Sequence, residues 1–219
     1  MHEPSRRNLL GLAALAPLAG GLLVGGSAAA DPSVATPTPA TPRQRISKRY
    51  FPNVLLRTQD NKEVRFYDDL IKDRVVTINF FFAKCEEICP IVTANLSRVQ
   101  RLLGDQIGRD IFMNSISLKP QDDTPAQLKR YAEMHKALPG WTFLTGDPKD
   151  IETLRRSLGF TNPDVKLDQD VNQHIGNIRY GNEPLMLWAA CPGQARPEWI
   201  AESVGWMVRP ETKAAIAAG

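Results

Sequence analysis

The sequence predicts a single α/β domain whose sheet is mainly parallel. Residues 74–82 are almost continuously apolar and rich in β-branched and aromatic side chains, which is typical of a strand buried on both faces. A helical pattern follows at residues 90–103, and strand and helix patterns alternate after it. Strand–helix–strand order at these lengths indicates parallel strands joined by right-handed crossovers.

The composition excludes several classes of protein. The chain has 219 residues, of which 42% are hydrophobic and 23% charged, as in ordinary globular proteins of one or two domains. The net charge of +3, without a basic stripe, does not indicate a nucleic-acid-binding protein. The apolar content excludes a disordered chain. Three cysteines leave one unpaired, which excludes a small domain held by a closed set of disulfides.

Residues 1–30 have the pattern of an export signal. The adjacent Arg6 and Arg7 precede an uncharged run of Ala, Leu and Gly that ends in small residues, and the arginine pair resembles the bacterial twin-arginine signal. We expect cleavage after Ala30. The alternative is an uncleaved anchor in the inner membrane, because residues 8–30 are just long enough to span a bilayer. Either outcome predicts that the rest of the chain is periplasmic.

Residues 31–49 are rich in Pro and Thr and show no pattern that could bury a face. Such a composition predicts a stiff, polyproline-like linker. The folded domain is therefore predicted to begin at Tyr50 and to cover residues 50–219.

The elements of this domain can be predicted in order along the chain. A leading β-hairpin turns at residues 59–61 and returns through a strand at 64–66. Gly104 ends the helix at 90–103, and Thr124 with Pro125 begins another as cap and first helical residue. The remaining predicted elements are strands at 74–82, 111–118, 141–144, 175–180 and 185–188, and helices at 148–158 and 197–208. This order fits a thioredoxin-like fold with an N-terminal β-hairpin and an extended C-terminal region.

Cys85 and Cys89 lie between the buried strand and the start of its helix. The free N–H groups and the dipole of a helix N-terminus favour thiolates. A spacing of four residues places both side chains on one helix face, with their Cβ atoms about 5–6 Å apart. That arrangement allows a disulfide or one soft metal ion between two thiolates, and Glu86 and Glu87 would favour a bound cation. Two cysteines buried as small hydrophobic residues are the structural alternative.

Three segments resemble the Sco/SenC family of thioredoxin-like, copper-binding assembly proteins for cytochrome c oxidase. They are residues 80–90 (FFFAKCEEICP), 115–125 (SISLKPQDDTP) and 141–146 (WTFLTG), and the resemblance covers about residues 50–180. It implies that one copper ion is bound by Cys85, Cys89 and His174. Lys119 stands where the family has an Asp, and residues 175–184 depart from the family's usual sequence. These departures leave open which client protein this chain serves.

Four other side chains have local interpretations. His135 is predicted to lie on a helix face, and Cys191 to be buried or idle. Asp168 and Asp170 precede His174, and they either orient its imidazole or are solvated.

Three functions remain as hypotheses. The first is a copper metallochaperone for a client copper protein such as a cytochrome c oxidase subunit. The second is a thiol–disulfide oxidoreductase in which Cys85 and Cys89 are the redox-active pair. The third is a peroxidase-like relative that forms a sulfenic acid, and only the fold supports it. Stoichiometric copper in the purified protein would favour the first, and turnover of a disulfide substrate without copper would favour the second.

Overall fold

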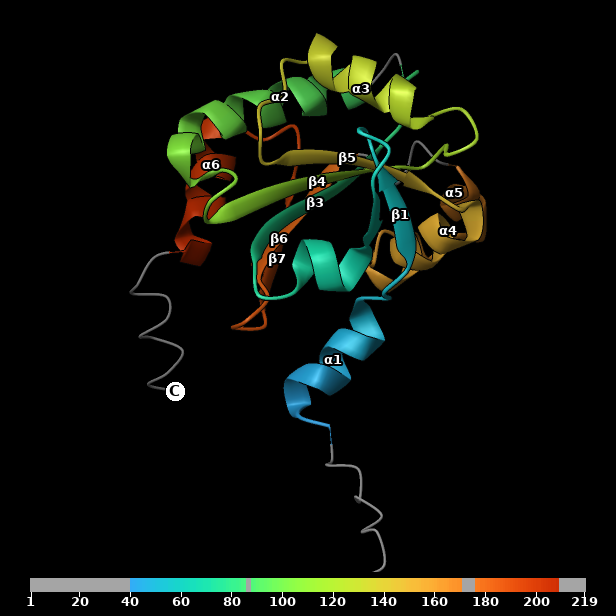
Figure 1. Cartoon of the computed structure of the whole chain (residues 1–219), viewed down its shortest axis with the longest axis vertical. Coiled ribbons are helices and arrows are strands. Elements are labelled where there is room, and N and C mark those ends of the chain that lie inside the picture. The colour runs from blue at the N-terminus through green and yellow to red at the C-terminus, as the bar shows by residue number, and fades with distance from the viewer. Residues whose placement is uncertain (1–39, 86–87, 171–175, 209–219) are drawn as a thin grey trace, which may run out of the picture. The chain divides into compact units, whose positions relative to one another are not determined.

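The structure, a computed structural model, describes residues 40–85, 88–170 and 176–208 (Figure 1). Its centre is a seven-stranded sheet in the order β2-β1-β5-β4-β3-β6-β7. The parallel core consists of β3 (Val75–Phe81), β4 (Ile111–Ser117) and β5 (Trp141–Gly146), in register with Val75 opposite Ile111 and Met113 opposite Trp141. All seven residues of β3 are buried, as its apolar sequence predicts.

Two antiparallel hairpins extend this core on either side. The N-terminal hairpin, β1 (Leu55–Thr58) and β2 (Glu63–Arg65), pairs with β5. The C-terminal hairpin, β6 (Asn177–Asn182) and β7 (Leu187–Pro192), pairs with β3. The predicted hairpin, parallel strands and C-terminal extension are therefore confirmed, and so is the thioredoxin-like fold class.

Helices cover both faces of the sheet (Figure 1). One hydrophobic core joins the sheet to α2 (Ile88–Leu103), α3 (Pro125–Met134) and α6 (Pro197–Gly205). A second core joins the opposite face to α4 (Pro148–Ser157) and the π-helical segment η1 (Phe66–Ile71). Alternate residues of β3 enter the two cores, because successive side chains of a strand point to opposite faces. The remaining short elements are η2 (Gly104–Gln106), α5 (Val165–Gln169) and η4 (Trp206–Val208).

The structure corrects the prediction of a polyproline-like linker through residue 49. A helix, α1 (Pro42–Tyr50), occupies its last part, and the compact unit that contains it begins at Pro39. Thr41 and Gln44 form a reciprocal capping box, and Pro42 stands in the first turn, where its missing N–H has no intrahelical partner to lose. The capping residues, and not the proline content, decide the local structure.

A buried carboxylate attaches α1 to the sheet. Glu183, in the turn between β6 and β7, is fully buried and forms an ion pair with Arg43 of α1. Glu183 also accepts hydrogen bonds from the Tyr67 hydroxyl at 2.9 Å and from the Asp73 backbone N–H at 2.8 Å. The one carboxylate therefore connects α1, η1 and the turn before β3 to the C-terminal hairpin.

Candidate metal centre

The two predicted cysteines lie at the carboxyl end of β3, where the chain turns into α2. The residues after β3 form a tight turn in which the Cys85 N–H donates to the Phe82 carbonyl at 3.2 Å. Cys85 is 8% exposed and Cys89 is 2% exposed. The carboxyl ends of parallel strands commonly carry ligand sites in α/β folds, because the chain there leaves the sheet to enter a helix N-terminus.

The cysteines do not share one helix face, which corrects the prediction from their spacing. Helix α2 begins at Ile88, so Cys89 lies in its first turn and Cys85 in the segment before it. The Cys89 backbone N–H donates to the Cys85 sulfur at 3.5 Å, and the two thiols lie within hydrogen-bonding reach of each other. Both cysteines are buried. Residues 86 and 87 lie outside the described residues.

Burial dominates the electrostatics of Cys89. The pKa of the Cys89 thiol is raised to about 12, mainly by burial, with smaller contributions from the nearby Cys85 and the Asp123 carboxylate. For Cys89, burial therefore opposes the thiolate that a helix N-terminus favours. At neutral pH a metal-free Cys89 carries its proton, and a thiolate-binding cation has to displace that proton.

Asp123 holds the cysteine-bearing turn against the sheet. It is 1% exposed, and its Oδ2 accepts hydrogen bonds from the Ala83 N–H at 3.0 Å and from the Ser117 hydroxyl at 2.5 Å. These contacts join the end of β4 to the turn that precedes Cys85. No role for Asp123 was predicted from the sequence, although its position in the Asp-Thr-Pro motif was a signal that could have identified it.

An aromatic cluster forms the floor beside the cysteines. Tyr131 of α3 packs on Phe81, with ring centroids 5.0 Å apart, and its hydroxyl hydrogen-bonds to Thr93 of α2 at 2.8 Å. Burial raises the pKa of Tyr131. His135, directly after α3, packs on the Tyr131 ring at 4.3 Å, and burial lowers the pKa of its imidazole. On this side the thiols therefore have aromatic, uncharged neighbours.

His174, the third predicted ligand, lies outside the described residues. Among residues 40–85, 88–170 and 176–208, no group of three or more His, Cys, Asp and Glu side chains could hold a metal ion. The described chain resumes at Gly176, whose φ of +104° favours glycine. A Cβ there would lie 3.0 Å from the Ile88 Cδ1, so the chain two residues after His174 packs against the residue that precedes Cys89.

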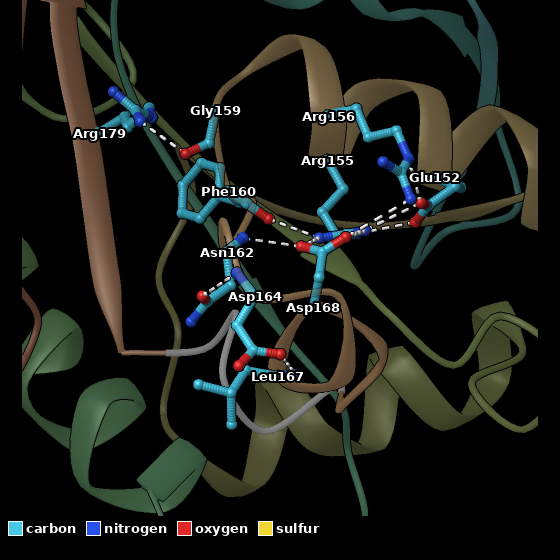
Figure 2. A network of polar contacts seen from close by, with 10 residues as sticks. All are labelled: Glu152, Arg155, Arg156, Gly159, Phe160, Asn162, Asp164, Leu167, Asp168 and Arg179. Carbon is cyan, nitrogen blue, oxygen red and sulfur yellow. Dashed lines mark hydrogen bonds and ion pairs between the residues drawn. The ribbon is translucent and has the colours of Figure 1, made fainter.

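Asp168 is not a solvated residue of an acidic loop, which corrects one of its two predicted roles. Its carboxylate binds the buried Arg155 guanidinium, with both Nη atoms at 2.9 Å, and accepts from the Asn162 N–H at 2.7 Å (Figure 2). Arg155 in turn donates to the Phe160 carbonyl at 2.7 Å. The network fixes α5 and the segment before it against the end of α4.

Cys191 is buried in β7, as predicted, and is 3% exposed. Burial raises the pKa of its thiol to about 11. In the unfolded chain a thiol ionises near pH 8.5, so between that pH and about 11 the unfolded state loses a proton that the folded state keeps. Stability contributed by the neutral thiol is therefore complete below pH 8.5 and is lost as the pH rises through this window.

We expect the Cys191→Ala variant to lose less stability at alkaline pH than the native protein does. Above pH 8.5 the free energy of unfolding of the native protein should fall by about 1 kcal/mol per pH unit more than that of the variant. The measurement is the free energy of urea unfolding from pH 7 to 10.5 for the reduced native protein and the variant. Cys89 contributes to both proteins alike and cancels in the difference. Parallel pH profiles for the two proteins would contradict the assignment.

In the part of the chain that the structure describes, no helix is both long enough and apolar enough to cross a membrane.

Comparison with known proteins identifies the family. The SCO1/SenC family model matches residues 55–208. A curated relative, the SCO1 protein homolog of Bacillus subtilis, is 36% identical over 89 residues, which are 40% of this chain and 45% of the relative. The alignment thus spans about half the length of that relative.

Solved structures of similar fold agree with this match. The Bradyrhizobium japonicum ScoI structure with copper bound has a TM-score of 0.56 and 23% identity, and the alignment covers 70% of this chain and 96% of that one. BsSco, described with a disulfide switch and as a member of the Sco family of cytochrome c oxidase assembly proteins, has a TM-score of 0.57 and 25% identity, with 70% and 90% covered. Because the family model spans most of the sequence and the fold agrees, this chain belongs to the SCO1/SenC family.

Proposed function

We propose that this protein is a copper metallochaperone that binds one copper ion through Cys85 and Cys89 and transfers it to a client copper protein. The observation that carries the proposal is the pairing of two buried cysteines at the start of α2, where the Cys89 N–H donates to the Cys85 sulfur and the two thiols lie within hydrogen-bonding reach. The family match and the copper-bound ScoI neighbour support copper as the cargo.

The chemistry of the donor set fits copper in its Cu(I) form. Cu(I) is soft and prefers thiolates, whereas Mg²⁺ and Ca²⁺ require several oxygen ligands. The neighbouring Phe81 and Tyr131 rings provide an environment of low polarity. Such surroundings favour a monovalent ion with two thiolates over a strongly hydrated divalent ion. Metal binding releases the Cys89 proton, so the affinity for Cu(I) should rise with pH.

We propose His174 as the third ligand, as the family resemblance implies. The packing of Gly176 against Ile88 supports this assignment, because it brings the chain that follows His174 to the start of the cysteine-bearing helix. Two thiolates can hold Cu(I) without a third donor, so the imidazole would adjust the affinity and geometry of the site. An exchangeable third ligand would also suit a protein that has to release its cargo.

A Cu(I) competition titration against a chromogenic chelator tests the proposal. We expect one Cu(I) per reduced native protein and the loss of stoichiometric binding in both Cys85→Ser and Cys89→Ser. Cys191→Ser is the matched control, because it removes a buried thiol from β7 and should leave the stoichiometry unchanged. Full binding by either of the first two variants would contradict the proposed ligands.

Replacement of His174 by alanine should weaken Cu(I) binding at least about tenfold, or roughly 1.4 kcal/mol, without unfolding the protein. The native affinity should also fall below about pH 6 as protons compete for the imidazole. The same titration measures both effects, with His135→Ala as the control. If His135→Ala loses affinity for Cu(I) and His174→Ala keeps the native affinity, the assignment of His174 as the third ligand is wrong.

The second candidate function is a thiol–disulfide oxidoreductase that reduces the cysteines of a periplasmic client. The adjacent Cys85 and Cys89 side chains favour it, and so does the disulfide switch described for the BsSco neighbour. One thiolate would attack the client disulfide, and the other would resolve the mixed disulfide, leaving Cys85 and Cys89 oxidised. Copper-free protein that reduces a disulfide substrate, with a Cys85–Cys89 link found by peptide mapping, would support this function over the first.

We infer that the protein works outside the cytoplasm, after twin-arginine export and cleavage following Ala30 or while anchored by residues 1–30. The proposed client is a copper-receiving protein such as a cytochrome c oxidase subunit, in line with the description of the BsSco neighbour. Mass spectrometry of the periplasmic fraction should find an N-terminus at Asp31. Full-length protein retained in the membrane would support the anchored form.

A further inference from the structure

A cavity of about 250 Å³ lies between α1, the end of α4 and the C-terminal hairpin. Its walls are mostly apolar, and Phe51, Ile78 and Leu158 in them belong to the second hydrophobic core. Cys85 and Cys89 belong to the first core, on the other face of the sheet. The cavity is therefore separate from the proposed copper site.

One cation lines this cavity. Arg179 of β6 is the only charged residue in its wall within the described part of the chain. The Arg179 Nη2 donates to the Gly159 carbonyl at 2.9 Å, and the guanidinium lies over the Phe160 ring at 5.2 Å (Figure 2). Its Nε is buried and has no hydrogen-bond partner among the described residues. Burial lowers the pKa of Arg179, and no neighbouring acid opposes that effect.

Trp188 of β7 adds a second donor without a partner. Its register partner is Gly181, two residues after Arg179, so Trp188 and Arg179 are diagonal neighbours on one face of the hairpin. A Cβ on Gly181 would lie 2.5 Å from the indole Cε3, so the indole lies over β6 where the side chain is missing. The indole also packs on Phe51, with ring centroids 4.7 Å apart. Its Nε1 is buried and unpartnered among the residues that the structure describes.

These features indicate an anionic ligand with an apolar body. Buried polar groups and charges in folded proteins are normally paired, and here a cation and two buried donors share a cavity wall without an acidic side chain. A guanidinium binds a carboxylate through strong, charge-assisted hydrogen bonds. The apolar walls favour a hydrocarbon chain over a strongly hydrated inorganic anion. The volume is below the roughly 300–1,000 Å³ of sites for drug-sized molecules, so the ligand is small.

We propose that this cavity binds a small monocarboxylic acid with an apolar chain. The carboxylate pairs with Arg179, and the chain packs against Phe51, Ile78 and Trp188. An occupant would contact α1, β3 and the C-terminal hairpin at once, and it should therefore stabilise the folded state by mass action. This activity is additional to copper binding and does not depend on it.

Calorimetric titration of the reduced, copper-free native protein with octanoate tests the proposal. We expect one site per chain and binding at least about tenfold tighter than that of octanol or octylammonium, which share the chain and lack the negative charge. Butanoate should bind at least about tenfold more weakly than octanoate, because its shorter chain buries less apolar surface. In the nuclear magnetic resonance spectrum, octanoate should shift the indole N–H signal that is absent from Trp188→Phe.

Replacement of Arg179 by methionine should weaken octanoate binding at least about tenfold and leave octanol binding unchanged. Arg74→Met is the matched control, because Arg74 also lies over an aromatic ring, Phe112 at 4.6 Å, and does not line this cavity. Should Arg179→Met fail to fold, Ser157→Phe fills the cavity from the end of α4 and should abolish octanoate binding.

Three results would overturn the proposal: no saturable octanoate binding by the folded native protein, equal affinities for octanoate and octanol, or native octanoate affinity in Arg179→Met. A Cu(I) titration of the Arg179 variant keeps the two activities apart. It should give the native stoichiometry, because the cavity and the cysteines lie on opposite faces of the sheet.

Discussion

Replacement of Arg43 by alanine is expected to reduce the free energy of unfolding by about 3 kcal/mol at pH 7. The substitution leaves Glu183, which is fully buried, without its cationic partner. The expected loss is at the low end of the range for broken buried pairs, because the Arg43 side chain is 37% exposed and water reaches part of the site. Tyr67 and the Asp73 N–H would still donate to the carboxylate.

The effect of Arg43→Ala should depend on pH in a defined direction. Burial acts to raise the pKa of Glu183, but the hydrogen bonds from Arg43, Asp73 and Tyr67 outweigh it and hold the pKa below the usual value. In the native protein the stability that ionised Glu183 contributes is fully present above pH 4.3, the usual pKa of Glu. It is lost as the pH falls through the lowered pKa of Glu183. Without Arg43 the burial contribution raises the pKa instead, so the variant takes up a proton at higher pH. The difference in free energy of unfolding between the native protein and Arg43→Ala should therefore become smaller as the pH is lowered from 6 to 4.

Urea unfolding of the native protein, Arg43→Ala and the control Lys48→Ala measures this effect. Lys48 is an exposed cation on the same helix, and its removal should change the stability by less than about 0.5 kcal/mol. Limited proteolysis should cut α1 sooner in Arg43→Ala alone, because Glu183 attaches that helix to the sheet. A loss of similar size in both variants would mean that the net charge, and not the buried pair, matters.

Replacement of Asp123 by alanine should reduce the free energy of unfolding by about 2–6 kcal/mol. The substitution leaves the part-buried Ala83 N–H and the buried Ser117 hydroxyl without this acceptor, each at a cost of about 1–3 kcal/mol. It should also weaken Cu(I) binding, because the turn before Cys85 loses its tie to β4. The removal of the negative charge should lower the raised pKa of Cys89, so a thiol reagent should modify Cys89 faster.

Asp122→Ala is the matched control for this experiment. Asp122 is the preceding residue, carries the same charge and is exposed, so its loss should change the stability by less than about 0.5 kcal/mol. Urea unfolding, Cu(I) titration and the rate of thiol modification are measured for both variants. Native stability in Asp123→Ala would show that the turn before Cys85 is held by other contacts.

The regular elements could be predicted because their patterns are local. Residues 74–82 are apolar in nearly every position, a pattern typical of a strand buried on both faces, and β3 is such a strand. The Thr124–Pro125 start of α3 was likewise predictable, because capping depends on neighbours within one turn. The capping box of helix α1, formed by Thr41 and Gln44, is equally local, but the proline-rich composition around it predicts a linker instead.

The candidate site was predictable in its chemistry and less so in its geometry. Two cysteines between a buried strand and a helix indicate a metal or redox site through their residue type and spacing alone. Their spacing does not indicate that Cys85 lies outside helix α2, or that Asp123 supports the turn before Cys85. For Asp168, the sequence offered solvation or a role beside the imidazole, and the structure supplies Arg155 as its partner.

The sequence by itself determined the fold class, the order of the strands and helices, the family resemblance and the pair Cys85 and Cys89, because each depends on residue types at short spacing. Only the tertiary structure decided the partners of Glu183, Asp123 and Asp168 and the raised pKa of Cys89. These depend on burial, which removes water from a charged or ionisable group and makes its stability depend on whichever side chains the fold places beside it. Such neighbours come from distant parts of the chain, as Arg43 does for Glu183.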